Sequence, residues 1–257
     1  MSSAAAQQPA LAPAIASTFT AVPPYAATQE QVKARLRDVF DLPARRLDAA
    51  MELFDHAAVE TRYSVEPIDR LGTRRPLGDI QDRYREHAFT LGRKVAGEAL
   101  VRAGVAPADI DLIVTTSCTG IMIPSLDAYL VDELGLRADV RRLPITELGC
   151  AGGAAALARA HDFLVGFPDA RALVIAVELP SLSMQRADLS PANLVSTALF
   201  GDGAAAAVLV GGAVEDDGEA GSVTILETLS HIWPRSTYAL GFDLKDDGFH
   251  SVLSKDV

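Results

Sequence analysis

The sequence predicts an α/β fold in which helices cover both faces of a mixed or parallel sheet. Three apolar segments rich in Val, Ile, Leu and Ala, at 110–116, 172–177 and 203–210, have the length of strands buried on both sides. Helical segments alternate with these strands, which is typical of this fold class. Hydrophobic residues make up 49% of the 257 residues, so the chain is large and apolar enough to form a substantial core.

The first eighty residues contain one predicted strand and two predicted helices. Residues 1–10 are of low complexity and are predicted to form a disordered tail. Alternating apolar and polar residues predict a strand at 15–19, and short helices are expected near 29–40 and 46–58. Prolines and glycines at 64–80 predict an irregular crossing.

The remaining elements follow in a regular order. Apolar residues on one face predict a long helix from Asp82 that ends at Gly104, and Gly135 is the expected stop of a second helix. The further predictions are a strand at 110–116, a helix at 125–134, a strand at 140–146, a helix opening at Cys150, a strand at 172–177, a helix at 193–199, a strand at 203–210 and a strand at 222–229. The glycine-rich and acidic residues 211–218 mark a boundary between two structural parts.

Charge and cysteine content exclude several classes of function. The formal net charge is −11, which argues against a nucleic acid or an anionic membrane as partner. Two cysteines do not form a disulfide framework, and they fit a reducing compartment. No apolar run reaches about 18 residues, and the first basic residue is Lys33, so neither a membrane span nor a secretory signal is expected. We expect a cytoplasmic protein.

The stretch ITELGCAGGAAALARAHDFL, residues 145–164, places Cys150 at a corner between a strand and a helix. The free N–H groups and the dipole at a helix start stabilise a thiolate. Gly149, Gly152 and Gly153 keep the corner open to a substrate, and the alanines that follow let the helix pack deeply. This pattern favours a nucleophile, and the alternative is a small buried hydrophobic residue.

Three blocks of sequence resemble the type III polyketide synthases, the branch of the thiolase superfamily that is similar to chalcone synthase. They are LIVTTSCTGIMIPSLDAYLVDELGL (112–136), VRRLPITELGCAGG (140–153) and ALFGDGAAAAVLVGG (198–212). The resemblance implies a thiolase-like α/β fold with an N-terminal βαβαβαββ half in α-β-α layers. It divides the chain into the tail, an N-terminal half at 11–214 that carries the nucleophile, and the start of a C-terminal half at 215–257.

The resemblance also implies an activity. The enzyme loads an acyl-CoA starter on Cys150, extends it with malonyl-CoA by decarboxylative Claisen condensation, and cyclises the product to a pyrone or a phenolic ring. The coenzyme A thioesters are substrates, so no cofactor and no metal are implied. A homodimer is implied as well.

Individual residues match functional positions of that family. Cys150 matches the catalytic nucleophile, Phe200 matches an aromatic gate between the coenzyme A tunnel and the reaction cavity, and Ile123 matches the residue that enters the partner subunit's cavity. Residues that match positions shaping the cavity are Cys118, Thr119 and Ser183. Ordinary packing at strand ends is the alternative for Cys118 and Ser183. Asp202, in a Gly-Asp-Gly turn, is expected to bond local backbone rather than to act in catalysis.

The family's catalytic His and Asn belong to its C-terminal half, and none of the five histidines matches that position. His161 is expected about three turns along the helix after Cys150, and His231 and His250 are expected at strand ends. We therefore expect the chain to be a fragment of a longer synthase that is inactive alone, with the core strands 110–116 and 172–177 left uncovered. The family's coenzyme A phosphate-binding residues are poorly matched, and Arg45, Arg46 and Arg62 are the candidate replacements.

Two rival interpretations remain open. A condensing enzyme similar to β-ketoacyl synthase III also has a cysteine at such a corner, although the sequence segments ELGCAGGA and FGDGAAA favour the polyketide branch. The other interpretation is a non-catalytic, truncated thiolase-fold chain that only dimerises with a complete partner.

Overall fold

The computed structural model describes residues 12–214 and 223–255, and the tail predicted at 1–10 lies outside them. Its centre is a six-stranded sheet with the order β5-β4-β6-β7-β1-β8. These strands are β1 (Ala14–Ala21), β4 (Leu112–Thr116), β5 (Arg141–Ile145), β6 (Arg171–Glu178), β7 (Gly203–Val210) and β8 (Val223–Thr224). β4 runs parallel to β5 and β6, whereas β7 is antiparallel to β6 and β1, so the predicted mixed sheet is confirmed.

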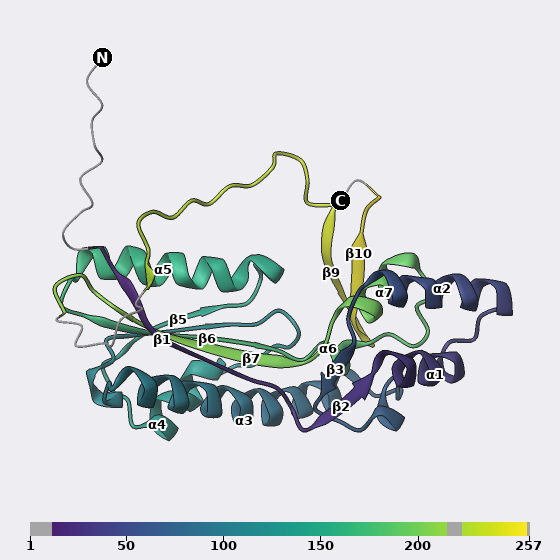
Figure 1. The fold of residues 1–257 in the computed structure, drawn as a ribbon, viewed down its shortest axis with the longest axis horizontal. Coiled ribbons are helices and arrows are strands. Elements are labelled where there is room, and N and C mark those ends of the chain that lie inside the picture. Colours follow the sequence, from purple (N-terminus) through teal and green to yellow (C-terminus); the bar gives the residue numbers. More distant parts are fainter. Residues whose placement is uncertain (1–11, 215–222, 256–257) are drawn as a thin grey trace, which may run out of the picture.

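Helices cover both faces of this sheet (Figure 1). The long helix α3 (Leu77–Ala103) and α4 (Leu126–Leu134) lie on one face, and α5 (Gly152–Gly166) lies on the other. Gly104 and Gly135 end α3 and α4 with φ angles of 63° and 73°, as the glycine stops in the sequence predict. The three-layer α-β-α arrangement is therefore as expected.

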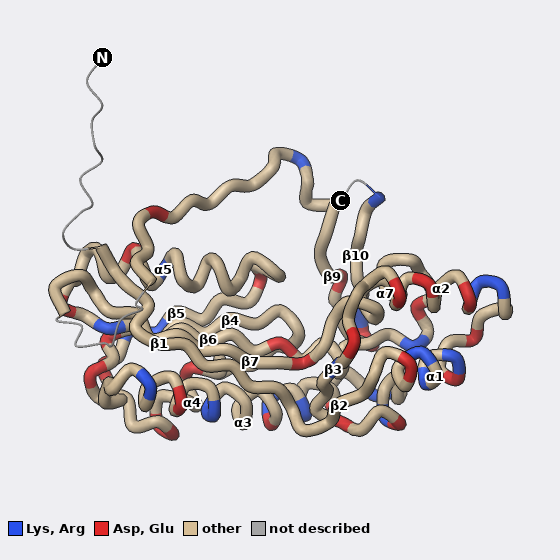
Figure 2. The backbone as a smooth tube through the Cα atoms, in the orientation of Figure 1, with Lys and Arg blue, Asp and Glu red and all other residues tan. Residues whose placement is uncertain are grey.

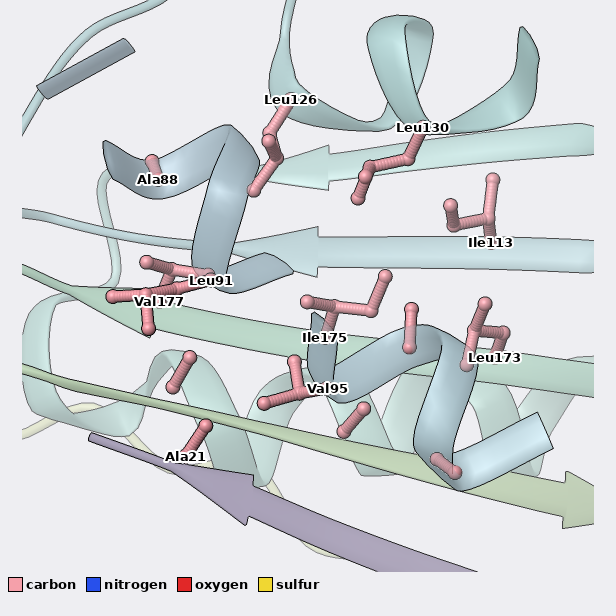
Figure 3. Close-up of a cluster of buried hydrophobic side chains, with 14 of the residues drawn as sticks. Ala21, Ala88, Leu91, Val95, Ile113, Leu126, Leu130, Leu173, Ile175 and Val177 are labelled. Atoms are coloured by element: carbon pink, nitrogen blue, oxygen red, sulfur yellow. The ribbon is translucent and has the colours of Figure 1, made fainter. Parts of the chain in front are cut away.

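The largest core cluster lies between the sheet and the α3–α4 layer (Figure 3). Its labelled members are Ala21, Ala88, Leu91, Val95, Ile113, Leu126, Leu130, Leu173, Ile175 and Val177. A second cluster on the other face joins β4, β6 and β7 to α5 through Val114, Ala160 and Leu209. All five residues of β4 are buried, as are residues 172–175 and 177 of β6, so the expectation that strands 110–116 and 172–177 are left uncovered is wrong. The α5 helix supplies that cover.

A smaller helical unit packs beside one end of the sheet. It consists of α1 (Gln29–Val39), α2 (Ala44–His56), α6 (Pro180–Ser183), α7 (Pro191–Leu199) and a hairpin of β2 (Tyr25–Thr28) with β3 (Thr61–Ser64). Its own apolar cluster includes Leu36, Phe54 and Ala198. Thr28 starts α1 with a capping box, and Ser190 caps α7.

Most predicted boundaries fall within two residues of the observed ones, but two of them differ by five residues. The long helix begins at Leu77 rather than Asp82, because Pro76 sits at its N-cap, where a proline does not interrupt the helix. Segment 64–80 is otherwise irregular as expected, and it contains the short 3-10 helix η1 (Ile68–Arg70); a second, η2 (Pro107–Asp109), precedes β4. The strand predicted at 222–229 is wrong in extent: β8 pairs with β1 only at Val223 and Thr224, and residue 222 lies outside the described residues.

The C-terminal part of the chain leaves the sheet. Residues 225–239 cross the molecule without regular structure and reach a separate hairpin of β9 (Leu240–Lys245) and β10 (Gly248–Leu253) (Figure 1). Figure 2 shows few charges along this crossing, and Leu229, Ile232 and Trp233 are exposed on it. Part of the exposed apolar surface thus lies on this crossing rather than on the core strands. No helix within 12–214 or 223–255 has the length and apolarity needed to cross a membrane.

Candidate active site

Cys150 lies at the corner between β5 and α5. The strand ends at Ile145, and Cys150 is the middle residue of a 3-10 helix, η3 (Gly149–Ala151), that leads directly into α5. Gly149 adopts a φ of 53°, a left-handed conformation that favours glycine and turns the chain toward the helix. Cys150 therefore precedes α5 by two residues rather than opening it. Its side chain is exposed, so the interpretation as a small buried residue is wrong.

The start of α5 lies directly against the end of β4. A Cβ atom on Gly152 would overlap the hydroxyl of Thr116, the last residue of β4. Glycine at this position lets the backbone of the corner approach the strand end closely. The two chain segments that carry Cys150 and Cys118 are held together in this way.

A cavity of about 700 Å³ opens at this corner. Four parts of the chain line it: the loop after β4, the 146–151 corner, helix α7 and the β9–β10 hairpin. Its lining is mainly apolar, and it contains Cys118, Cys150 and Phe200 among the predicted site residues. A large apolar cavity with few polar groups is the usual form of a small-molecule site.

The two thiols of the cavity have different environments. Burial, reinforced by the negative charge and hydrogen bonding of Glu178, raises the pKa of the Cys118 thiol to about 12. Cys118 is therefore overwhelmingly a neutral thiol near neutral pH, whereas Cys150 is exposed to the cavity. The thiolate is the nucleophilic form of cysteine, so this difference favours Cys150 as the reacting residue.

Glu178, at the end of β6, holds the loop that carries Cys118. Its carboxylate accepts hydrogen bonds from the backbone N–H of Cys118 at 3.0 Å and from the hydroxyl of Thr119 at 2.6 Å. Burial raises the pKa of Glu178. Sequence reasoning missed this residue, although a carboxylate at the end of a buried strand, beside a parallel neighbour, was the signal that could have identified it.

The structure separates the other predicted site residues from the cavity. Thr119 is buried and donates to Glu178 while it accepts from the Leu179 N–H, so its hydroxyl is occupied by structural bonds. Ser183 lines a smaller cavity of about 70 Å³ instead. Ile123 is 93% exposed, on the loop before α4. Within the described residues, the large cavity thus gathers Cys118, Cys150 and Phe200 but not these three.

Phe200 lies where the two cavities meet. It follows the last residue of α7, is 40% exposed, and lines both the large and the small cavity. Ser196, Phe242 and Ser251 are shared in the same way. An aromatic ring in this place has the position that a gate requires.

Asp202 has a structural role, but its bonds are not local as the Gly-Asp-Gly turn suggested. The buried carboxylate accepts hydrogen bonds from the Val65 N–H at 2.8 Å, and from the Ser181 N–H at 2.9 Å and hydroxyl at 2.6 Å. It therefore connects three distant segments. Burial raises the pKa of Asp202 to about 6, although these hydrogen bonds act in the opposite direction.

Arg62 is not available for a coenzyme A phosphate. Its side chain is buried, donates to the Gln29 side chain and to the Ala198 carbonyl, and stacks on the Phe54 ring at 5.3 Å. The arginine therefore ties β3 to α1, α2 and α7. Arg45 and Arg46 remain exposed in the first turn of α2.

All five histidines are described, and none lines the large cavity. His161 lies on α5 as predicted. The expectations for His231 and His250 were wrong: His231 belongs to the irregular crossing and His250 lies within β10.

Sequence reasoning also missed the wall that the β9–β10 hairpin contributes. This wall includes Leu240, Phe242, Phe249 and Val252. The apolar residues alternating with polar ones in LGFDLK and GFHSVL were the available signal.

Comparisons with known proteins identify the family of this chain. The N-terminal domain of chalcone and stilbene synthases matches residues 69–213. A 1,3,6,8-tetrahydroxynaphthalene synthase of Streptomyces peucetius subsp. caesius is 40% identical over 243 residues, which cover 95% of this chain and 64% of that protein. A phloroglucinol synthase of Pseudomonas fluorescens is 35% identical, with coverage of 91% and 66%.

A solved structure confirms the predicted thiolase-like α/β fold. The 1,3,6,8-tetrahydroxynaphthalene synthase of Streptomyces coelicolor A3(2), a bacterial type III polyketide synthase, superposes with a TM-score of 0.87 at 36% identity, covering 95% of this chain and 68% of that one. The chain spans 59–64% of the length of three tetrahydroxynaphthalene synthases that it resembles. By the family match and these relatives, the chain belongs to the chalcone and stilbene synthase family of type III polyketide synthases.

Proposed function

We propose that this chain provides the acyl-carrying part of a polyketide synthase that condenses coenzyme A thioesters, with Cys150 as the nucleophile. The observation that carries the proposal is the exposed Cys150 at a strand-to-helix corner of a 700 Å³ apolar cavity. The 40% identity to a tetrahydroxynaphthalene synthase supports it.

The chemistry follows from the properties of a thiolate. Cys150 attacks the carbonyl of an acyl-CoA, forms a thioester and releases coenzyme A as the thiolate, in a nearly isoenergetic exchange. Malonyl-CoA then loses carbon dioxide and becomes an enolate, which attacks the Cys150 thioester carbonyl. A carbon–carbon bond forms, the Cys150 thiolate leaves, and the acyl chain is two carbons longer.

The cavity supports repeated extension followed by cyclisation. Its apolar lining, with Phe200 at the junction to the smaller cavity, suits a site in which reactive intermediates must be kept from water. Phe200 acts as the gate, Cys118 shapes the reaction cavity, and Ser183 shapes the small one. Two of the more similar relatives are named for phenolic products and a less similar one for an α-pyrone, so a phenolic product is the favoured class.

Ile123 supports a homodimer as the working form. It is 93% exposed on the same loop as Cys118, which suits a side chain that packs against a second copy. We also retain the division into an N-terminal half at 11–214 and the start of a second half from 215. The separation of the β9–β10 hairpin from the main sheet supports this division.

The decarboxylation step needs an imidazole and a side-chain amide aimed at the enolate oxygen, and the described residues do not place this pair in the cavity. No histidine lines the cavity within 12–214 and 223–255, and the side-chain amide of Asn193 donates to the Gln185 and Asp188 carbonyls instead. Losing one donor to a developing oxyanion costs about 10²–10³ in rate. Residues 1–257 alone are therefore expected to accept an acyl group without releasing carbon dioxide from malonyl-CoA.

Labelled malonyl-CoA tests the proposal on a complete synthase, in which residues 1–257 are joined to a C-terminal half that supplies the histidine and the asparagine. Incubated with this synthase and a range of acyl-CoA starters, labelled malonyl-CoA should give labelled polyketide by liquid chromatography and mass spectrometry, and Cys150→Ala should abolish that product. An unchanged product from Cys150→Ala would refute the assignment.

The β-ketoacyl synthase alternative differs in its extender. Such an enzyme would prefer malonyl groups on an acyl carrier protein, so extension only from the carrier-bound malonyl group would favour the alternative. Failure of the full chain to bind or turn over any thioester would instead favour the non-catalytic interpretation.

A further inference from the structure

The β9–β10 hairpin depends on contacts outside itself for its position. It forms a two-stranded sheet of its own, without pairing to the six-stranded sheet. Isolated two-stranded hairpins are at best marginally stable in water. The hairpin nevertheless supplies a whole wall of the Cys150 cavity, including Phe242 and Phe249. Whatever holds this hairpin therefore fixes the shape of the cavity.

His250 joins the hairpin to the loop that precedes α7. Its Nε2 atom lies 2.8 Å from Asp247 Oδ1, across the hairpin turn, and its Nδ1 atom lies 3.6 Å from Asp188 Oδ2. The His250 and Asp188 side chains are only 16% and 18% exposed, which limits screening of this contact by water. The hydrogen bond from His250 lowers the pKa of Asp247.

The loop on the other side of this contact is firmly joined to α7. Asp188 accepts a hydrogen bond from the N–H of Ser190, the N-cap residue of α7, at 2.9 Å. Asn193, in the first turn of α7, donates to the carbonyls of Gln185 and Asp188, each at 2.7 Å. The contact with His250 therefore fixes the hairpin relative to α7, the helix that ends directly before Phe200.

The hairpin turn itself rests on the same loop. Gln185 donates to the Asp247 carbonyl at 3.2 Å. Gly248 adopts a φ of 128°, and a Cβ atom there would lie 2.6 Å from Gln185 Nε2. A side chain at position 248 would clash with Gln185, so glycine lets the hairpin turn contact the loop directly. His250 contacts Asp188 of the same loop beside this turn.

We infer that His250 is a positioning residue that bridges Asp247 and Asp188 and thereby seats the β9–β10 hairpin against α7. The bond to Asp247 fixes the imidazole across the hairpin turn, and the second ring nitrogen then faces the Asp188 carboxylate. Loss of the imidazole should therefore loosen the hairpin from the loop that precedes α7.

Other charged groups lie around this contact. Asp243 lies opposite His250 in the hairpin register. Lys245 lies near Asp247 and lowers its pKa, and Arg186, in the loop with Asp188, is exposed. Any effect of the hairpin's position on catalysis rests on the proposed function, whereas the contact of His250 with Asp247 and Asp188 does not.

Hydrogen exchange of the hairpin amides tests the inference without any activity assay. At one fixed pH, exchange of residues 240–253 should be about fivefold to tenfold faster in His250→Gln than in the wild type, the range for one lost side-chain hydrogen bond at a partly exposed site. Exchange in β6, measured in the same experiment, reports whether the core is intact.

Two further variants complete the design. Asp188→Asn keeps an oxygen for the Ser190 N–H but removes the charge that faces His250, so it should also speed hairpin exchange, and the double variant should add little. His231→Gln, on the exposed crossing, is the matched control and should behave like the wild type. Hairpin exchange that is unchanged by both His250→Gln and Asp188→Asn would overturn the inference. Acylation of Cys150, measured separately, distinguishes this failure from failure of the proposed function.

Discussion

Replacing Asp202 with asparagine should change how the stability of the protein depends on pH. Asp202 is 4% exposed, and burial raises its pKa from an ordinary 3.8 to about 6. The folded state therefore binds a proton more tightly than the unfolded state between these two values. Asp202 contributes stability that is complete below about pH 4 and is lost as the pH rises through about 6. The side-chain amide of the Asp202→Asn variant does not titrate, so the variant lacks this contribution.

The magnitude follows from the two pKa values. The interval from 3.8 to about 6 corresponds to about 3 kcal/mol of unfolding free energy, since one pH unit is worth about 1.4 kcal/mol. Solvent screening reduces this little, because the carboxylate is buried. The unfolding free energy of the wild type minus that of Asp202→Asn should therefore fall by about 3 kcal/mol between about pH 4 and pH 7.

Urea denaturation followed by circular dichroism at a series of pH values measures this difference. Carboxyl groups elsewhere contribute equally to both proteins and cancel. Glu98→Gln, an exposed position on α3, is the matched control and should give parallel curves. A difference that stays constant or grows with pH would refute the reasoning, because the three hydrogen bonds from Val65 and Ser181 would then outweigh burial.

Three further perturbations test the site. Phe200→Ala should alter the accepted starters or product lengths with little change in melting temperature, because the ring is 40% exposed between two cavities. A loss of about 3–5 kcal/mol in the free energy of unfolding, with an unchanged product profile, would show that Phe200 is a core residue. Alkylation by iodoacetamide near pH 8, mapped by peptide mass spectrometry, should label Cys150 at least about a hundredfold faster than Cys118, whose pKa of about 12 leaves almost no thiolate; equal labelling would contradict the assigned environments. Gly152→Ala should destabilise the protein by about 1–3 kcal/mol and slow acylation of Cys150, because α5 must move away from Thr116. Gly153→Ala, which has open space around it, is the control and should be tolerated. Unfolding curves that coincide for the two variants would argue against the close approach of α5 to Thr116.

The sequence predicted the parts of the fold that depend on local pattern. β7 begins and ends at the predicted residues, and Gly104 and Gly135 end their helices as expected, because apolar periodicity and glycine stops act over a few residues. Cys150 was identifiable because its corner and its glycines are contiguous in the chain. These signals do not require knowledge of the tertiary structure.

The features that escaped prediction depend on contacts between distant residues. Glu178 reaches Cys118 and Thr119 across some sixty positions, and Asp202 reaches Val65 across 137. The hydroxyl of Thr119 is likewise engaged by distant residues, since it bonds Glu178 and the N–H of Leu179. The strand expected at 222–229 stopped at Thr224 because pairing with β1 ends there, which apolar pattern alone does not reveal. The hairpin wall of the cavity is remote from Cys150 in the chain, so only the fold brings them together.

The central claim is that Cys150 is the residue that carries the acyl group. Incubation of the full chain with a series of acyl-CoA thioesters, followed by digestion and peptide mass spectrometry, tests it directly. The account predicts an acyl adduct on the peptide that contains Cys150, absent from Cys150→Ala and retained in Cys118→Ala. An adduct found on Cys118 alone, or one that persists in Cys150→Ala, would contradict it.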